Sequence, residues 1–79
     1  MTSIEKELAH LRKAEQHISD GEARISVQHA RIEALRQDGR AIGDAEHMLA
    51  LLIATLAQWH AHREDILRRI ACLEAAGQA

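Results

Sequence analysis

Isoleucine and leucine recur at every seventh residue through the first half of the chain. The series comprises Ile4, Leu11, Ile18, Ile25 and Ile32. Leu8 and Leu35 lie beside it and add apolar surface near its two ends. This spacing is typical of one face of a long α-helix that packs against another helix. The residues "TSIE" have the form of a capping box, in which Thr2 caps the helix and Glu5 occupies its third position. The pattern predicts a helix over about 3–37.

The second half of the chain carries a heptad pattern with alternating spacings of three and four. The pattern comprises Leu49, Leu52, Leu56, Trp59, Arg63, Ile66, Ile70 and Leu73. More than three repeats of this kind predict a second long helix, over about 44–75. Asp44 is suited to cap this helix, and Glu46 in its first turn is favourable to the helix dipole. We expect Gly77 and the small polar tail to fray.

A short break separates the two helices in the stretch "QDGRAIGDAEH". Gly39 suits the left-handed conformation that commonly ends a helix. A loop over about 38–43 is short enough to make the two helices antiparallel neighbours. We therefore expect an all-α fold, in which residues 1–79 form a single antiparallel two-helix hairpin of the coiled-coil type.

The position of the loop predicts which residues of the two helices face each other. If the chain reverses around residues 40 and 41, Ile25 faces Leu56, and Trp59 lies opposite Gly21 and Glu22. Glycine is costly in the middle of a helix. This arrangement explains Gly21 as the space into which the large Trp59 ring fits.

The same register predicts an ion pair at the seam between the helices. Arg63 occupies a seam position and falls near Ile18, between Glu15 and Glu22. We expect its guanidinium group to pair with one of these two glutamates. Such a pair specifies the register of the helices more than it adds stability.

Residues 48–57, "MLALLIATLA", carry apolar side chains on several faces of the expected second helix. Ten residues are too few to cross a bilayer, which needs about 20. We expect an oligomer interface on the side that does not face the first helix, formed by Met48, Ala50, Leu51, Ile53, Ala54, Ala57 and Ala61. Two hairpins then associate as a homodimer, which is a four-helix bundle with the second helices central. The alternative is that the alanines are only good helix formers on a solvated face, which leaves Leu51 and Ile53 unexplained.

Composition narrows the classes of function. The net charge of −2 argues against binding to nucleic acid or to an anionic membrane, because such proteins usually carry a basic field. Cys72 is the only cysteine, and a lone thiol favours a reducing compartment. The charged beginning, "MTSIEKELAHLRKAE", lacks the apolar run of a secretory signal. We expect a cytoplasmic protein.

Histidines are the main candidates for chemistry, and the chain has six. The pair Glu7 and His10 shares one helix face, as does the pair Asp44 and His47. These two pairs lie about 45 Å apart by helix rise, which excludes a shared di-metal site within the hairpin. A looser zinc site at the open end of the hairpin is an alternative, formed by Glu7, His10, Cys72 and Glu74.

A mildly basic stripe runs along the flank of the first helix at intervals of seven: His10, His17, Arg24 and Arg31. We interpret this stripe as solvated surface that can pair with acidic groups of a partner chain. The serines and threonines lack a glycine-rich turn, and the four glycines are scattered, so neither a nucleophile elbow nor a phosphate-binding loop is indicated. We expect no enzyme, no catalytic residue and no cofactor.

Two resemblances bear on function. A dimeric helical hairpin with histidines resembles in architecture the phosphotransfer domain of sensor kinases, but "HRED" at His62 lacks that family's order of histidine, acid and proline. The runs "GEARISVQHARIEALRQDG" and "AEHMLALLIATLAQWHAHREDIL" resemble small helical-hairpin proteins of alphaproteobacteria, of the rhizobial type, with no known activity. That resemblance covers residues 14–70 and implies a bacterial cytoplasmic hairpin without an assigned site.

The sequence thus predicts a non-enzymatic protein–protein interaction or assembly module that acts as a homo-oligomeric helical bundle. Its partners are a second copy of itself and an unidentified protein. The alternative is a helical bundle that binds a metal or a small ligand through its histidines.

Overall fold

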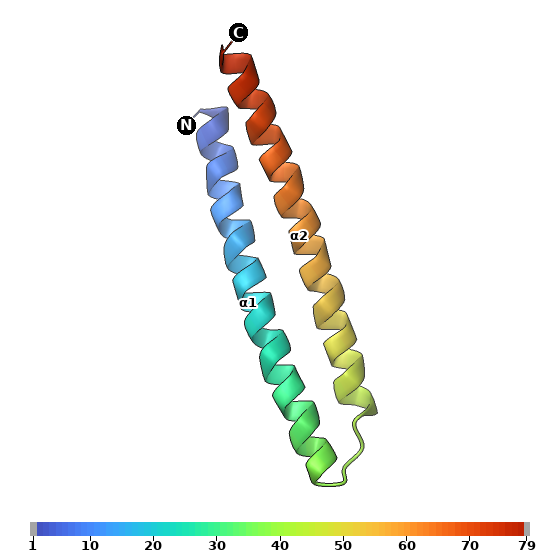
Figure 1. The fold of residues 1–79 in the computed structure, drawn as a ribbon. Coiled ribbons are helices and arrows are strands. Elements are labelled where there is room, and N and C mark those ends of the chain that lie inside the picture. Colours follow the sequence, from blue (N-terminus) through green and yellow to red (C-terminus); the bar gives the residue numbers. More distant parts are fainter. Residues whose placement is uncertain (1, 79) are drawn as a thin grey trace.

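A computed structural model describes residues 2–78 as two long helices joined by a short loop. Helix α1 spans Ser3–Gln37 and helix α2 spans Gly43–Gln78. The helices lie side by side and run in opposite directions, so both ends of the chain lie at the same end of the molecule (Figure 1). The molecule measures 64 × 16 × 13 Å. The prediction of an antiparallel two-helix hairpin is confirmed.

Local signals fix both ends of α1 as the sequence predicts. The Thr2 hydroxyl accepts a hydrogen bond from the Glu5 N–H, and the Glu5 carboxylate accepts one from the Thr2 N–H, both at 3.1 Å. The capping box is therefore present. At the other end Gly39 adopts a φ of +69°, and the Arg40 N–H donates to the Leu35 carbonyl at 2.9 Å. This bond is the outer one of a Schellman motif, which satisfies a carbonyl that the helix leaves free.

The two ends of α2 differ from the prediction. The helix begins at Gly43, and the Ile42 carbonyl already accepts the first helical hydrogen bond, from the Glu46 N–H at 2.8 Å. Asp44 therefore lies in the first turn beside the helix dipole, and its assignment as the cap is wrong. The helix also continues to Gln78, beyond the end predicted near residue 75.

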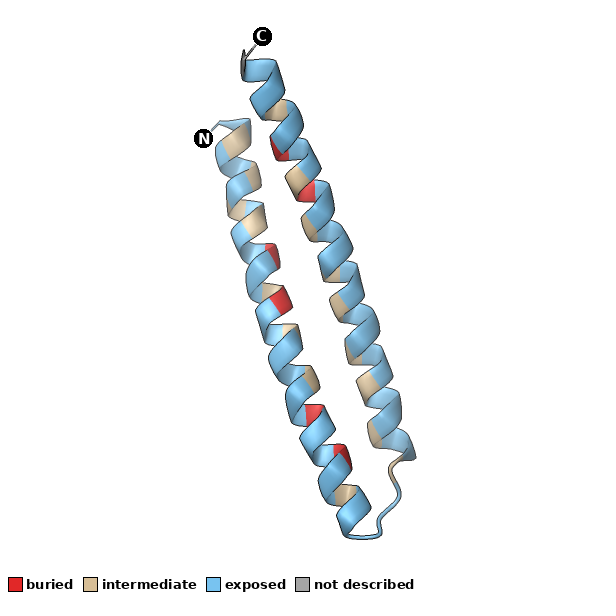
Figure 2. Ribbon diagram, viewed as in Figure 1, coloured by how far each residue is buried: buried red, intermediate tan, exposed pale blue. Residues whose placement is uncertain are grey.

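The core between the helices is small. Ile66 is fully buried and packs with Ala14 and Ile70, while Leu11 and Trp59 lie against this group. Both buried residues of α2 lie in the half nearer the chain ends (Figure 2). In the half nearer the loop, the seam leucines of α2 are only partly buried: Leu49, Leu52 and Leu56. The hairpin alone therefore buries its second helix incompletely.

One buried polar residue ties the helices together near the loop. Gln28 is 6% exposed, and its Nε2 donates a hydrogen bond to the Ala45 carbonyl at 2.9 Å. A polar residue at a seam position fixes the register of paired helices, because a shift leaves it buried without a partner. The residue pattern indicates no role for Gln28, since the partner of this side chain is a backbone carbonyl that the pattern does not reveal.

The register differs from the prediction by about one helical turn. Leu56, which the predicted register places opposite Ile25, packs on Gly21, and Trp59 stacks on His17. The expectation that Gly21 makes room for the Trp59 ring is therefore wrong, because the Leu56 side chain occupies that space. The loop climbs back beside the last turn of α1 before α2 begins (Figure 1). After the turn at residues 38 and 39, residues 40–42 have no regular secondary structure and each cover up to about 3.3 Å against 1.5 Å in a helix, which accounts for a shift of about one turn.

We predict that Gly21→Leu lowers the free energy of unfolding by about 1–3 kcal/mol, because overpacking forces neighbouring side chains to move. A Cβ at this position already lies 3.2 Å from Cδ1 of Leu56. Thermal and urea denaturation, followed by circular dichroism, measure the effect. Adding Leu56→Ala to Gly21→Leu should recover part of the loss. A double variant that is less stable than Gly21→Leu by the full cost of Leu56→Ala would contradict this packing.

Candidate interaction surfaces

The predicted seam arginine forms an ion pair across the helices. Nε of Arg63 lies 3.5 Å from the Glu15 carboxylate, and Nη1 lies 3.3 Å from Glu64 on its own helix. Glu22 lines the same shallow surface hollow as Arg63 but lies beyond ion-pair distance of it among the described residues. The side chains of Arg63 and Glu15 are 34% and 49% exposed, so water screens their attraction.

A second pair joins the helices at the open end of the hairpin. Nε of Arg69 donates to the Glu7 carboxylate at 3.1 Å, and Nδ1 of His10 lies 3.8 Å from the same carboxylate. The Glu7 side chain is only 16% exposed, so this pair is better shielded than the pair of Arg63. Glu7 was predicted as a candidate zinc ligand, and Arg69 was not predicted as its partner. The sequence does contain a sign of this ion pair, since Glu7 stands at a seam position where an apolar residue is usual.

The candidate metal ligands do not come together. Among the described residues, no group of three or more histidine, cysteine, aspartate or glutamate side chains could hold a metal ion. Cys72 is an exposed free thiol. The set at the open end is therefore reduced to the pair of His10 with Glu7, whose carboxylate also binds Arg69.

Trp59 stacks with two histidines on one side of the seam. The His17 ring lies parallel to the indole ring, with centroids 4.1 Å apart, and His62 meets it edge-on at 5.7 Å. His60 lies on the other side and lines the hollow that contains Arg63. This placement follows from helix geometry, because residues two apart point in nearly opposite directions.

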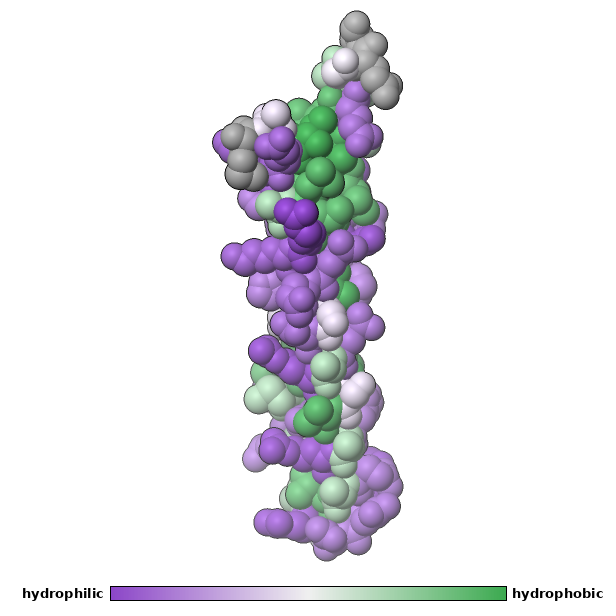
Figure 3. All heavy atoms as spheres, turned by 90° about the vertical axis from the view of Figure 1, so that its left-hand side faces the viewer, coloured by the Kyte–Doolittle hydropathy of each residue, from purple (hydrophilic) through white to green (hydrophobic). Residues whose placement is uncertain are grey.

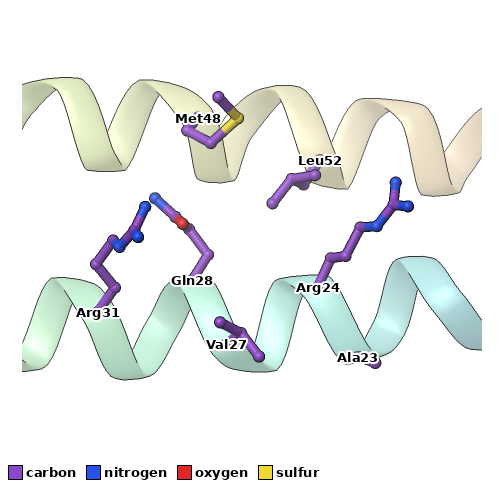
Figure 4. Close-up of a pocket in the computed structure, with 7 residues that line it drawn as sticks. All are labelled: Ala23, Arg24, Val27, Gln28, Arg31, Met48 and Leu52. Atoms are coloured by element: carbon purple, nitrogen blue, oxygen red, sulfur yellow. The ribbon is translucent and has the colours of Figure 1, made fainter.

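A groove follows the Trp59 side of the hairpin toward the loop. Its central part has a volume of about 410 Å³ and lies between α1 and α2, with Arg24 and Arg31 toward its two ends (Figure 4). Apolar side chains form most of the wall between the arginines, with Val27 from α1 and Met48 and Leu52 from α2. The Val27 side chain is 67% exposed, which is unusual for a large apolar residue in the middle of a helix.

The residues predicted for an oligomer interface are all exposed in the single chain. Met48 differs from the others because it lines the groove. Leu51 and Ile53 are 50% and 49% exposed, and, being two residues apart, they point about 160° away from each other around the helix. They flank the outward stripe formed by Ala50, Ala54, Ala57 and Ala61 on its two sides.

The side of the molecule formed mainly by α1 is largely hydrophilic (Figure 3). Apolar atoms gather there near the end that carries both chain ends, and Leu8, in the N-terminal part of α1, is 41% exposed. No helix among the described residues is long and apolar enough to span a membrane. Most of the larger exposed apolar side chains belong to α2 or line the groove: Val27, Met48, Leu51 and Ile53.

The chain matches no family model, no curated protein and no solved structure with which it was compared. We therefore infer function from the arrangement of residues in the structure.

We predict a coupling free energy below about 1 kcal/mol between Arg63 and Glu15, because exposed ion pairs gain little over their hydration. A double-mutant cycle with Arg63→Gln and Glu15→Gln, measured by urea denaturation, gives this value. The matched control replaces Glu15→Gln with Glu22→Gln and should give no coupling. Equal coupling to both glutamates would show that Arg63 does not select Glu15.

Proposed function

We propose that the protein is a non-enzymatic assembly module that acts as a homodimer, in which two hairpins associate through α2 into a four-helix bundle. The observation that supports this proposal is the amount of apolar surface that the single hairpin leaves uncovered. Leu51 and Ile53 are each about half exposed, whereas among the described residues of α2 only Ile66 and Ile70 are buried.

The area of the hairpin fits the need for a partner. The single chain exposes 5860 Å², whereas a compact monomer of 8.8 kDa exposes about 4,800 Å². The surplus of about 1,100 Å² is comparable with the roughly 800 Å² that each partner buries in a standard protein interface. The radius of gyration is 18.1 Å, against about 12 Å for a compact domain of this length. Both differences reflect the elongated shape of the hairpin.

The alanine stripe of α2 is suited to the close approach of two helices. Ala54 and Ala57 allow two backbones to come near each other, and Leu51 and Ile53 on the flanks close over the contact from both sides. Completing the burial of each half-exposed flanking side chain contributes about 1 kcal/mol per chain. Two-fold symmetry doubles this contribution, because each copy presents the same residues.

The thiol of Cys72 supports a reducing compartment for this module. Cys72 is free and exposed, and an exposed thiol persists in its reduced form in a reducing compartment. We propose on this ground that the module acts in the cytoplasm.

We predict that Ala57→Glu converts the homodimer into a monomer, because it places a carboxylate in the contact where the helices approach most closely. Sedimentation equilibrium at micromolar concentration should give twice 8.8 kDa for the unchanged protein and 8.8 kDa for the variant. Ala30→Glu is the matched control, since it makes the same replacement at an exposed alanine of α1 and should leave the dimer intact. A monomeric unchanged protein, or a dimeric Ala57→Glu variant, would overturn the proposal.

A further inference from the structure

The groove on the Trp59 side is a continuous surface rather than a single hollow. Its central part shares Arg24 and Leu52 with a second hollow beside Trp59, and it shares Gln28, Arg31 and Met48 with a third beside the loop. Along α1 the lining extends from residue 17 to residue 35. By helix rise this distance is about 27 Å, the length of a helix of about 18 residues.

The shape of this surface suits a third helix. Two parallel or antiparallel helices leave a furrow on each side of their contact, and an amphipathic helix can lay its apolar face into such a furrow. Val27 and Met48, 67% and 48% exposed, lie beside Leu52 in the centre of the groove and provide the apolar contact (Figure 4). A helix there would cover side chains that the hairpin itself leaves in water.

The charge of the groove indicates the character of the partner. Arg24 and Arg31 stand one heptad apart, about 10.5 Å along the helix. Among the described residues neither has a carboxylate within 4.0 Å, whereas Arg36, Arg63, Arg68 and Arg69 each have at least one. The two aspartates of the groove lie outside this central segment, Asp20 beside Trp59 and Asp44 beside the loop. The centre is therefore cationic and can bind carboxylates in the two-pronged manner of arginine.

A second copy of the chain does not complement this charge. In an antiparallel two-fold contact centred on Val27, Arg24 of one copy meets Arg31 of the other at both ends of the contact. Facing like charges that lose water disfavour such a pairing. The alanine stripe of α2 has no Asp, Glu, Lys or Arg between Ala50 and Ala61, so the two surfaces suit different partners.

We propose that the groove binds an acidic amphipathic helix of another protein. Its apolar face packs on Val27, Met48 and Leu52, and two of its carboxylates, seven residues apart, pair with Arg24 and Arg31. This contact is separate from the homodimer, because it uses the side of α2 that faces the groove and not the alanine stripe.

Synthetic peptides test this proposal directly. The first peptide has 18 residues, leucines at heptad positions, and flanking glutamates seven residues apart. The second has lysine in place of each glutamate, and the third has the composition of the first in scrambled order. Fluorescence anisotropy of labelled peptides against the full chain should show micromolar binding for the first and at least tenfold weaker binding for the other two.

Reversing the charge of the two groove arginines is the second test. Arg24→Glu with Arg31→Glu should invert the preference, so that the lysine peptide binds more tightly than the glutamate peptide. The control pair, Arg12→Glu with Arg68→Glu, changes the net charge equally on surfaces outside the groove and should leave the preference unchanged. Circular dichroism establishes that both variants keep the fold.

Three results would overturn the proposal. Equal binding of the acidic and scrambled peptides would show attraction by charge alone. An unchanged preference in the Arg24→Glu, Arg31→Glu variant would exclude the two arginines. A Val27→Glu variant that sediments as a monomer, while the unchanged chain is a dimer, would show that a second copy covers the groove.

Discussion

The structure depends on the seam between α1 and α2, and on the side chains that α1 contributes to it. One repeating position of α1 holds large apolar residues, whereas the other holds Glu7, Ala14, Gly21 and Gln28 before it ends at Leu35. Small side chains at this position let Ile66 and Leu56 approach α1 closely. The same position adds little apolar area, so among the described residues the seam buries only five hydrophobic ones. The thin core and the uncovered apolar face of α2 are two consequences of one pattern.

Polar contacts supply the specificity that so small a core lacks. Gln28 near the loop, Arg63 in the middle and Arg69 at the open end each bind a partner on the other helix. Each contact joins one particular pair of residues, whereas a heptad of leucines and isoleucines fits a neighbouring turn almost as well. This division explains why the polar residues Glu7, Gln28 and Arg63 stand at seam positions, although the two ion pairs add little stability.

The elements of the fold were predictable, but their relative position was not. Thr2, Glu5 and Gly39 act through bonds within a few residues, so the sequence alone predicts the limits of α1. The register depends on how far residues 40–42 climb beside α1, and no residue pattern encodes that distance. The prediction of the oligomer interface had a similar limit. Periodicity identifies the apolar residues that lie outside the seam, but it does not show whether they lie on the same side of the helix. Met48 therefore belongs to the groove, whose lining residues depend on the register.

We propose that the hairpin needs a second copy to cover α2. The concentration dependence of thermal unfolding is a direct test, because association that stabilises the folded state makes the melting temperature rise with protein concentration. Over about a hundredfold range of concentration, we expect a rise of several degrees. A melting temperature that stays constant over this range, in a chain that sediments at 8.8 kDa, would contradict it.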